Sequence, residues 1–90
     1  PVDAAVEVPG RIADGAAQGE RVGGLPGPVD AMVRREIEIQ KLAVDAAVLG
    51  SRELALEALL LDPVVHSARA AEAFLDDVLR LHAAYLPTFR

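Results

Sequence analysis

The distribution of apolar and polar positions divides the chain near residue 28. Glycine and proline are frequent before that point, and six of the seven glycines lie in residues 1–27. After it, apolar residues recur every three or four positions, which is the spacing of one face of an α-helix. We therefore expect a first part, 1–27, with a strand or hairpin and a Gly/Pro-rich loop, and a helical second part, 28–90. The two parts are expected to form one small fragment.

Three helices are predicted in the second part, over Pro28–Leu49, Ser51–Leu61 and Ser67–Ala84. Pro28 suits a first helical position, where its missing N–H would be unpaired in any case. Gly50 can end the first helix in the left-handed conformation. Ser51 and Ser67 are expected N-caps, and Pro63 pushes the residue before it out of the α region.

The apolar faces of the second and third helices predict where the core lies. The second helix is apolar over most of its circumference, which predicts burial on two sides. The third is amphipathic, and Asp76 and Asp77 are expected to face solvent. Its predicted core face consists of Ala71, Phe74, Leu75, Val78, Leu79, Leu81 or His82, and Tyr85.

The first part contains the signals of short strands. Alternation over Ala4–Val8 predicts one strand, and Arg11–Ala13 predicts another. Asp14-Gly15 is a turn signal, Glu20–Val22 is the expected partner strand, and Ala16–Gly19 between them is expected to be disordered. The predicted fold class is therefore mostly α with a short β-hairpin, an α+β fragment.

Composition limits what the chain does alone. Ninety residues form one small domain, and more than a third of the hydrophobic residues, which make up 52% of the chain, are alanine, with only three aromatic residues. We therefore expect a partner surface, either another domain or a second copy. The net charge of −5 argues against nucleic acid, and charges interrupt every apolar run before it reaches membrane-spanning length. The chain has no cysteine, which is compatible with the cytoplasm, and its first residue is Pro, which suggests a piece of a longer product.

No titratable group forms a convincing catalytic or metal site. His66 and His82 are the only histidines, and neither has a Cys or His partner at a metal-binding spacing. We interpret His66 as a loop residue and His82 as part of an amphipathic helix. The carboxylate pairs Glu36/Glu38 and Asp76/Asp77 diverge around their helices and are interpreted as solvated faces rather than acid–base pairs.

Two further candidates concern anions. Gly19–Gly24 is glycine-rich but lacks the spacing of dinucleotide and phosphate loops, so a plain loop is the better interpretation. Arg34 and Arg35 are interpreted as surface residues, with Arg35 able to pair with Glu38 one turn on. No catalytic, cofactor-binding or metal-binding residue is assigned, and the chain alone is not expected to be an enzyme.

Several short motifs, in this order and spacing, resemble the C-terminal end of the family 4 glycoside hydrolases, which include α-galactosidase and 6-phospho-β-glucosidase types. Val6–Pro9 resembles a V-x-V-P strand end, and Val22–Pro26 resembles a V-G-x-L-P approach to a helix. Leu42–Pro63 resembles L-x-V-E-A-A…G…L-A…A-L…(D/N/H)-P, and Tyr85–Phe89 matches Y-L-P-x-F. The short connection Pro63–Ser67 is closer to the phospho-β-glucosidase branch, whereas Gln18-Gly19 stands where the family commonly has a proline.

The resemblance implies a parent enzyme that uses NAD and a divalent metal, usually manganese, to oxidise the sugar at C3 and then eliminate the glycosidic substituent. It implies a missing N-terminal dinucleotide-binding domain, a homo-oligomer and a cytoplasmic location. The family's metal-site cysteine and histidine lie upstream, so no site residue is carried onto this chain. The chain would then be an inactive scaffold or oligomerisation fragment of the substrate domain. The alternatives are a stand-alone helical dimerisation module and a functionless remnant.

Overall fold

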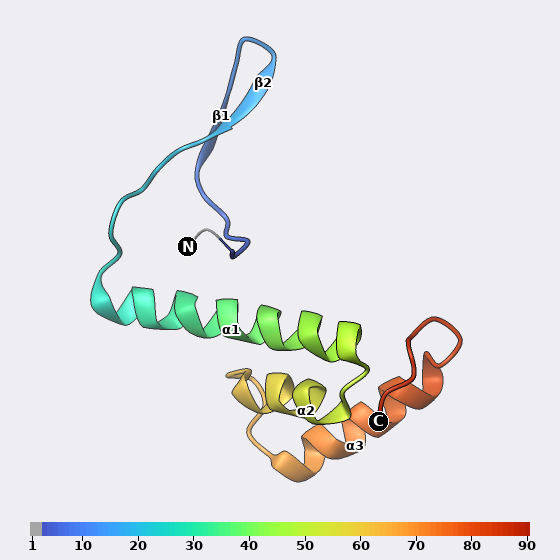
Figure 1. The fold of residues 1–90 in the computed structure, drawn as a ribbon. Helices are drawn as coiled ribbons and strands as arrows, with labels where there is room; N and C mark the ends of the chain where they lie inside the picture. The colour runs from blue at the N-terminus through green and yellow to red at the C-terminus, as the bar shows by residue number, and fades with distance from the viewer. Residues whose placement is uncertain (1–2) are drawn as a thin grey trace. The chain divides into compact units, whose positions relative to one another are not determined.

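The computed structural model describes residues 3–90 and contains a two-stranded antiparallel hairpin and three α-helices (Figure 1). The strands are β1 (Gly10–Ala13) and β2 (Ala16–Gly19), and the helices are α1 (Gly27–Leu49), α2 (Arg52–Leu61) and α3 (Ala68–Leu81). The chain divides into two compact units, one up to Ile37 and one from Glu38 onward. The mostly helical α+β class is confirmed.

The hairpin is built on a two-residue turn. Asp14 and Gly15 both have positive φ, 52° and 77°, as a type I′ turn requires. Such a turn places the residues on its two sides directly opposite each other, so Ala13 pairs with Ala16 and Gly10 with Gly19. One more hydrogen bond, from the Glu20 amide to the Pro9 carbonyl at 2.7 Å, follows the last pair.

Three strand predictions are therefore wrong in detail. Ala16–Gly19 is the partner strand rather than a disordered loop, because the tight turn leaves no room for one. Glu20–Val22 lies beyond the ladder. Ala4–Val8 is not a strand, because it has no partner strand among residues 3–90, and Val6 and Val8 are exposed.

The helix boundaries follow the predicted capping residues. Gly50 has φ of 62°, and the Ser51 amide donates to the Ala46 carbonyl at 2.9 Å, which is the six-to-one hydrogen bond of a Schellman motif. The Ser51 Oγ accepts from the Leu54 amide, and the Ser67 Oγ accepts from the Ala70 amide, each at 3.2 Å. Both serines are N-caps, as predicted.

The third helix ends earlier than predicted, at Leu81 instead of Ala84. The amides of Tyr85 and Leu86 both donate to the carbonyl of His82, which turns the chain away from the helix axis. The turn lets the tail reach back to the start of α2, where the Arg90 amide donates to the Gly50 carbonyl at 2.7 Å. Because the tail makes this return, residues 82–84 cannot continue the helix.

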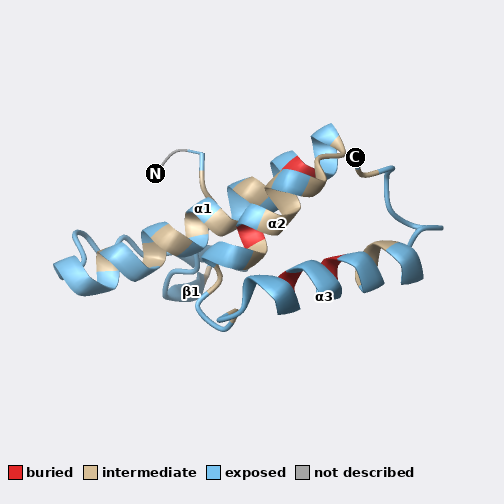
Figure 2. Ribbon diagram, turned by 90° about the horizontal axis from the view of Figure 1, so that it is seen from below, coloured by how far each residue is buried: buried red, intermediate tan, exposed pale blue. Residues whose placement is uncertain are grey.

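The core of the second unit is small. Among residues 3–90 the buried side chains are Ala46 on α1, Ala58 on α2, and Ala71 and Leu75 on α3 (Figure 2). Helices α2 and α3 pack on each other. The expected burial of α2 on two sides is not seen, because Leu60 and Leu61 are exposed. Of the predicted α3 face, Val78 and Leu79 are half-buried, but Phe74, Leu81, His82 and Tyr85 are exposed.

Candidate functional site

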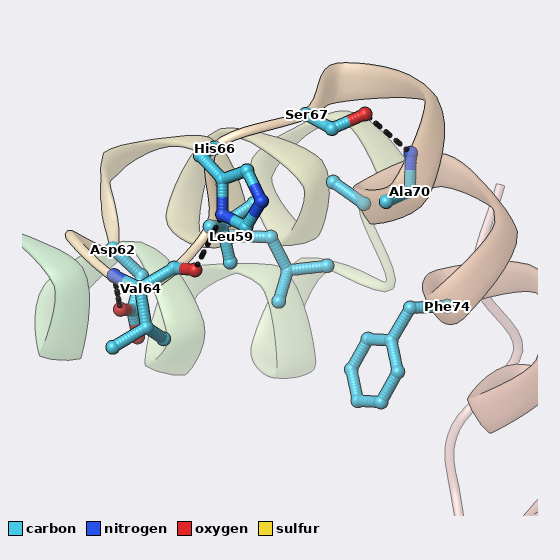
Figure 3. A pocket seen from close by; sticks show the side chains of 9 residues that line it. Leu59, Asp62, Val64, His66, Ser67, Ala70 and Phe74 are labelled. Carbon is cyan, nitrogen blue, oxygen red and sulfur yellow. Dashed lines mark hydrogen bonds between the residues drawn. The ribbon is translucent and has the colours of Figure 1, made fainter.

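The second unit contains an apolar groove of about 390 Å³ where α2 turns into α3 (Figure 3). We call it the α2–α3 groove. Its apolar wall comes from the end of α2, the connection and the first turns of α3, and comprises Leu59, Val64, Val65, Ala70, Ala71 and Phe74. Asp62, His66 and Ser67 contribute the polar lining.

The connection is rigidified by its own polar groups. Asp62 ends α2 and its carboxylate Oδ1 accepts the Val64 amide at 2.9 Å, so the side chain closes a turn around Pro63. The Asp62 carbonyl accepts the Val65 amide at 3.0 Å. The Ser67 cap then starts α3. Asp62 and Ser67 therefore both hold the backbone of the connection in place.

His66 is the one titratable group in the groove besides Asp62. Its Nδ1 lies 3.3 Å from the Val64 carbonyl oxygen, which can accept the proton of the Nδ1–H tautomer. A general base also needs a nucleophile or substrate oxygen within hydrogen-bond reach, and the hydroxyl that lines the groove, Ser67 Oγ, accepts from the Ala70 amide while His66 is paired with the Val64 carbonyl. His66 is a loop residue, and His82 is the C-cap of α3, far along the chain from it.

The carboxylates predicted to face solvent form ion pairs there. Asp76 accepts a hydrogen bond from the Arg52 guanidinium, which links α3 to the start of α2, and Asp77 pairs with Arg80 at 2.9 Å. The hydrogen bond to Asp76, and then its charge, raise the pKa of Arg52 above the usual arginine value. Neither carboxylate converges with the other on a common point, so acid–base chemistry is not supported here.

The arginines of α1 also pair within their own helix. Arg34 Nε donates to Asp30 Oδ2 at 2.7 Å, and that hydrogen bond raises the pKa of Arg34. The predicted pairing of Arg35 with Glu38 is wrong, since Arg35 lies 3.7 Å from Glu36 and Glu38 lies 3.7 Å from Lys41. Glu38 lies one helical turn after Arg35 but pairs with Lys41, which lies one turn further along α1.

The first unit contains another groove, of about 610 Å³, lined by the segments before and after the hairpin and by the first turns of α1. The glycine-rich segment forms part of its wall, with Gly23 at a positive φ of 74°. Arg21 and Arg34 line it together with Glu7 and Asp30, so its charges are mixed. This balance does not favour phosphate, which clusters of cationic groups bind.

Within residues 3–90, no three His, Asp or Glu side chains come close enough to hold a metal ion together. The described helices include none that is long and apolar enough to cross a bilayer.

Comparison with known proteins identifies the family of this chain. Residues 1–65 match the model of the family 4 glycosyl hydrolase C-terminal domain. The chain therefore belongs to the family 4 glycosyl hydrolases and corresponds to their C-terminal domain, as the sequence motifs indicated.

The relatives are phosphoglucosidases. The chain is 37% identical over 89 residues to a protein of Bacillus subtilis named "Probable 6-phospho-beta-glucosidase", covering 99% of this chain and 20% of the relative. It is 31% identical over 83 residues to a phospho-α-glucosidase of Clostridium acetobutylicum, covering 92% of this chain and 19% of the relative. The relatives thus include both α and β types, so they do not distinguish the branch that the short connection suggested.

A solved structure shows the same fold. It is a 6-phospho-α-glucosidase from gut microorganisms, crystallised in complex with NAD and glucose-6-phosphate. The match has a TM-score of 0.80 and 28% sequence identity and covers 93% of this chain and 19% of that one. The chain spans about a fifth of the length of the proteins that it matches.

The α2–α3 groove was not predicted from the sequence. Phe74 was assigned to the core because it lies beside Leu75 on the apolar side of α3. One signal pointed to the groove, namely an aromatic residue following a Pro-containing connection too short to cover it. The spacing of apolar residues does not reveal the groove, because it does not show how the connection between α2 and α3 folds.

Proposed function

We propose that this chain is the C-terminal part of an NAD-dependent glycosidase that acts on 6-phosphoglucosides, hereafter the parent enzyme. The family match supports a glycosidase. The names of the relatives support a phosphorylated glucoside, and the NAD in the solved structure supports the cofactor. The anomer stays open, since α and β enzymes are both among the relatives.

The role proposed for residues 1–90 is to complete the substrate domain as a scaffold. The observation that carries this is the mismatch between apolar content and burial: four described side chains are buried, whereas Val48, Leu49 and Phe74 are each more than half exposed. A chain that hides so little apolar surface has little free energy with which to fold alone. Contact with the rest of a larger protein would supply the missing burial.

The cofactor and metal are proposed to bind outside this segment. The part of the chain that the structure describes offers no metal-binding group of side chains, and its glycine-rich loop lacks a dinucleotide fingerprint. The NAD and the divalent metal, manganese by family resemblance, would supply hydride transfer and polarisation of the sugar in the other part of the parent enzyme. In this proposal residues 1–90 contribute packing. The division of the chain at residue 27 and the cytoplasmic location of the parent enzyme stay predictions.

The test is an activity assay on the full-length protein that carries this segment. We expect it to hydrolyse p-nitrophenyl 6-phospho-α- or 6-phospho-β-glucoside when NAD and Mn²⁺ are present, and to lose activity with a chelator. The unphosphorylated glucosides are the matched substrates, and residues 1–90 alone are the protein control. Turnover by residues 1–90 alone, or none by the full-length protein under any of these conditions, would contradict the proposal.

The alternative is a helical module that dimerises through its exposed apolar faces. The exposure of Val44, Val48 and Leu49 along the end of α1 favours this reading. Sedimentation of the full-length protein, beside a Val48→Glu variant, separates the two functions. A dimer that dissociates on this substitution, in a protein without glycosidase activity, would favour the module.

A further inference from the structure

The α2–α3 groove combines an apolar floor with an exposed aromatic rim. Ala71 and Leu75 on α3 are 3% and 6% exposed, whereas Phe74 between them is 57% exposed. Figure 3 shows the Phe74 ring standing at one end of the groove, with the Leu59 side chain beside it along the wall. A half-exposed aromatic ring next to an apolar hollow is the kind of anchor that dominates protein–protein contacts.

We propose that this groove is a docking site for apolar side chains from the part of the parent polypeptide outside residues 1–90. This rests on the proposed function, because it requires a larger enzyme around the segment. The groove measures about 390 Å³, enough for a small number of aliphatic or aromatic side chains. Filling it would bury Phe74 and extend the small core formed by Ala71 and Leu75.

The length of the relatives favours an occupant from the same polypeptide. This chain spans about a fifth of each relative, so most of such a polypeptide lies outside it. In the solved 6-phospho-α-glucosidase the same fold occupies 19% of one chain. A segment of the same chain is also tethered, so its effective concentration at the groove is high without any further affinity.

Charge and polarity disfavour the other occupants. Asp62 lines the groove, so a two-fold pairing of two such grooves would bring two like charges together. A small polar ligand needs several convergent hydrogen-bonding groups, but six of the nine lining residues are apolar, and the Asp62 Oδ1 and the Ser67 Oγ are already bonded to backbone amides. An apolar protein segment satisfies both constraints.

Photocrosslinking in the full-length protein tests the site directly. Phe74 is replaced by p-benzoylphenylalanine, and Ala73, exposed and outside the groove, receives the same residue as the matched control. We expect irradiation to give crosslinks from position 74 to residues outside this segment of the same chain, several-fold more than from position 73. Peptide mapping identifies them, and the gel mobility of a monomer shows that they lie within one polypeptide.

Two outcomes would overturn the proposal: crosslinked dimers from position 74, which indicate a second copy, or a yield at position 74 no higher than at position 73. Thermal unfolding gives an independent readout. Phe74→Asp should lower the midpoint of the full-length protein by several degrees and by more than Phe74→Leu, while Ala73→Asp leaves it nearly unchanged. Equal effects of Phe74→Asp and Ala73→Asp would mean that the ring stays in solvent. Assaying phosphoglucosidase activity on the same samples separates failure of the docking site from failure of the proposed function.

Discussion

The backbone amide of Arg90 donates a hydrogen bond to the carbonyl oxygen of Gly50 over 2.7 Å. The Arg90 carbonyl in turn accepts from the Arg52 amide at 2.9 Å, so one residue of the tail bridges the turn between α1 and α2. Phe89 lies beside this bridge and lines a small hollow with Ala46 and Ala58, two of the four residues that are buried among those the structure describes. The tail therefore closes the helical unit at the point where α1 ends.

Gly50→Ala should destabilise this closure. Gly50 has φ of 62°, which costs a side-chain-bearing residue about 1 kcal/mol or more, and an added Cβ would overlap the carbonyl oxygen of Thr88. We expect the thermal midpoint of the parent enzyme to fall by a few degrees, and the Arg90 amide to exchange its hydrogen faster. Gly24→Ala is the matched control, since Gly24 has open space around it. An equal effect of the two substitutions would show that the tail contact contributes nothing.

The hairpin should depend on Gly15. A type I′ turn requires positive φ at both central residues, and alanine at position 15, with φ of 77°, pays a cost of about 1 kcal/mol. Because an isolated two-stranded hairpin is marginally stable, Gly15→Ala should speed hydrogen exchange throughout β1 and β2. Asp14→Asn keeps a residue that tolerates this conformation and should leave exchange unchanged. Unaltered protection in Gly15→Ala would rule out the turn.

The start of α3 should depend on the Ser67 hydroxyl. Ser67→Ala removes the acceptor of the Ala70 amide, at a cost of about 1 kcal/mol, so hydrogen exchange at Ala70 should accelerate about fivefold. Ser67→Asp supplies another acceptor and should restore the slow exchange. If alanine and aspartate behave alike, the hydroxyl is not the cap.

The helices could be predicted from the sequence because their signals are local. Gly50, Ser51 and Ser67 each act through hydrogen bonds within a few residues. The end of α1 and the starts of α2 and α3 therefore lie where the sequence predicts them. The end of α3 is different. It depends on the return of the tail to Gly50, a contact across forty residues that no periodicity reports.

The hairpin register and the groove could not be predicted for related reasons. The turn signal at Asp14-Gly15 was recognised, but the register follows from how that turn folds, with φ positive at both residues. The amphipathic pattern of α3 correctly marked Ala71 and Leu75 as core. The same pattern placed Phe74 in the core. It shows which side of the helix a residue lies on, but not whether other residues cover that side.

The Arg52–Asp76 ion pair should stabilise the fold slightly, and dissolved salt should screen this stabilisation. It links α2 to α3, and both side chains are partly exposed, so Asp76→Asn should destabilise slightly and the difference should shrink as ionic strength rises.

The pH dependence of the Arg52–Asp76 pair follows from the raised pKa of Arg52. A cation whose pKa is raised on folding stabilises at all pH values below its unfolded pKa and loses that effect only above it. The contribution of Arg52 should therefore stay constant from neutral pH to about pH 10. A loss of the Asp76→Asn difference within that window would contradict it.

Leu75 should be the most sensitive position of the helical unit. It is the largest of the buried side chains at 6% exposure and lies on α3, which packs on α2, whereas Leu81 on the same helix is 65% exposed. Leu75→Ala removes buried methyl groups and leaves a cavity, at a cost of about 2–5 kcal/mol, with the lower end expected where so small a core can collapse. Leu81→Ala makes the same chemical change at an exposed position and should cost less than half as much. Urea unfolding monitored through local hydrogen exchange of α2 and α3 measures both. Equal costs at the two positions would mean that Leu81 is as deeply buried in the full-length protein as Leu75 is here, and the apolar face of α3 would then be covered along its whole length.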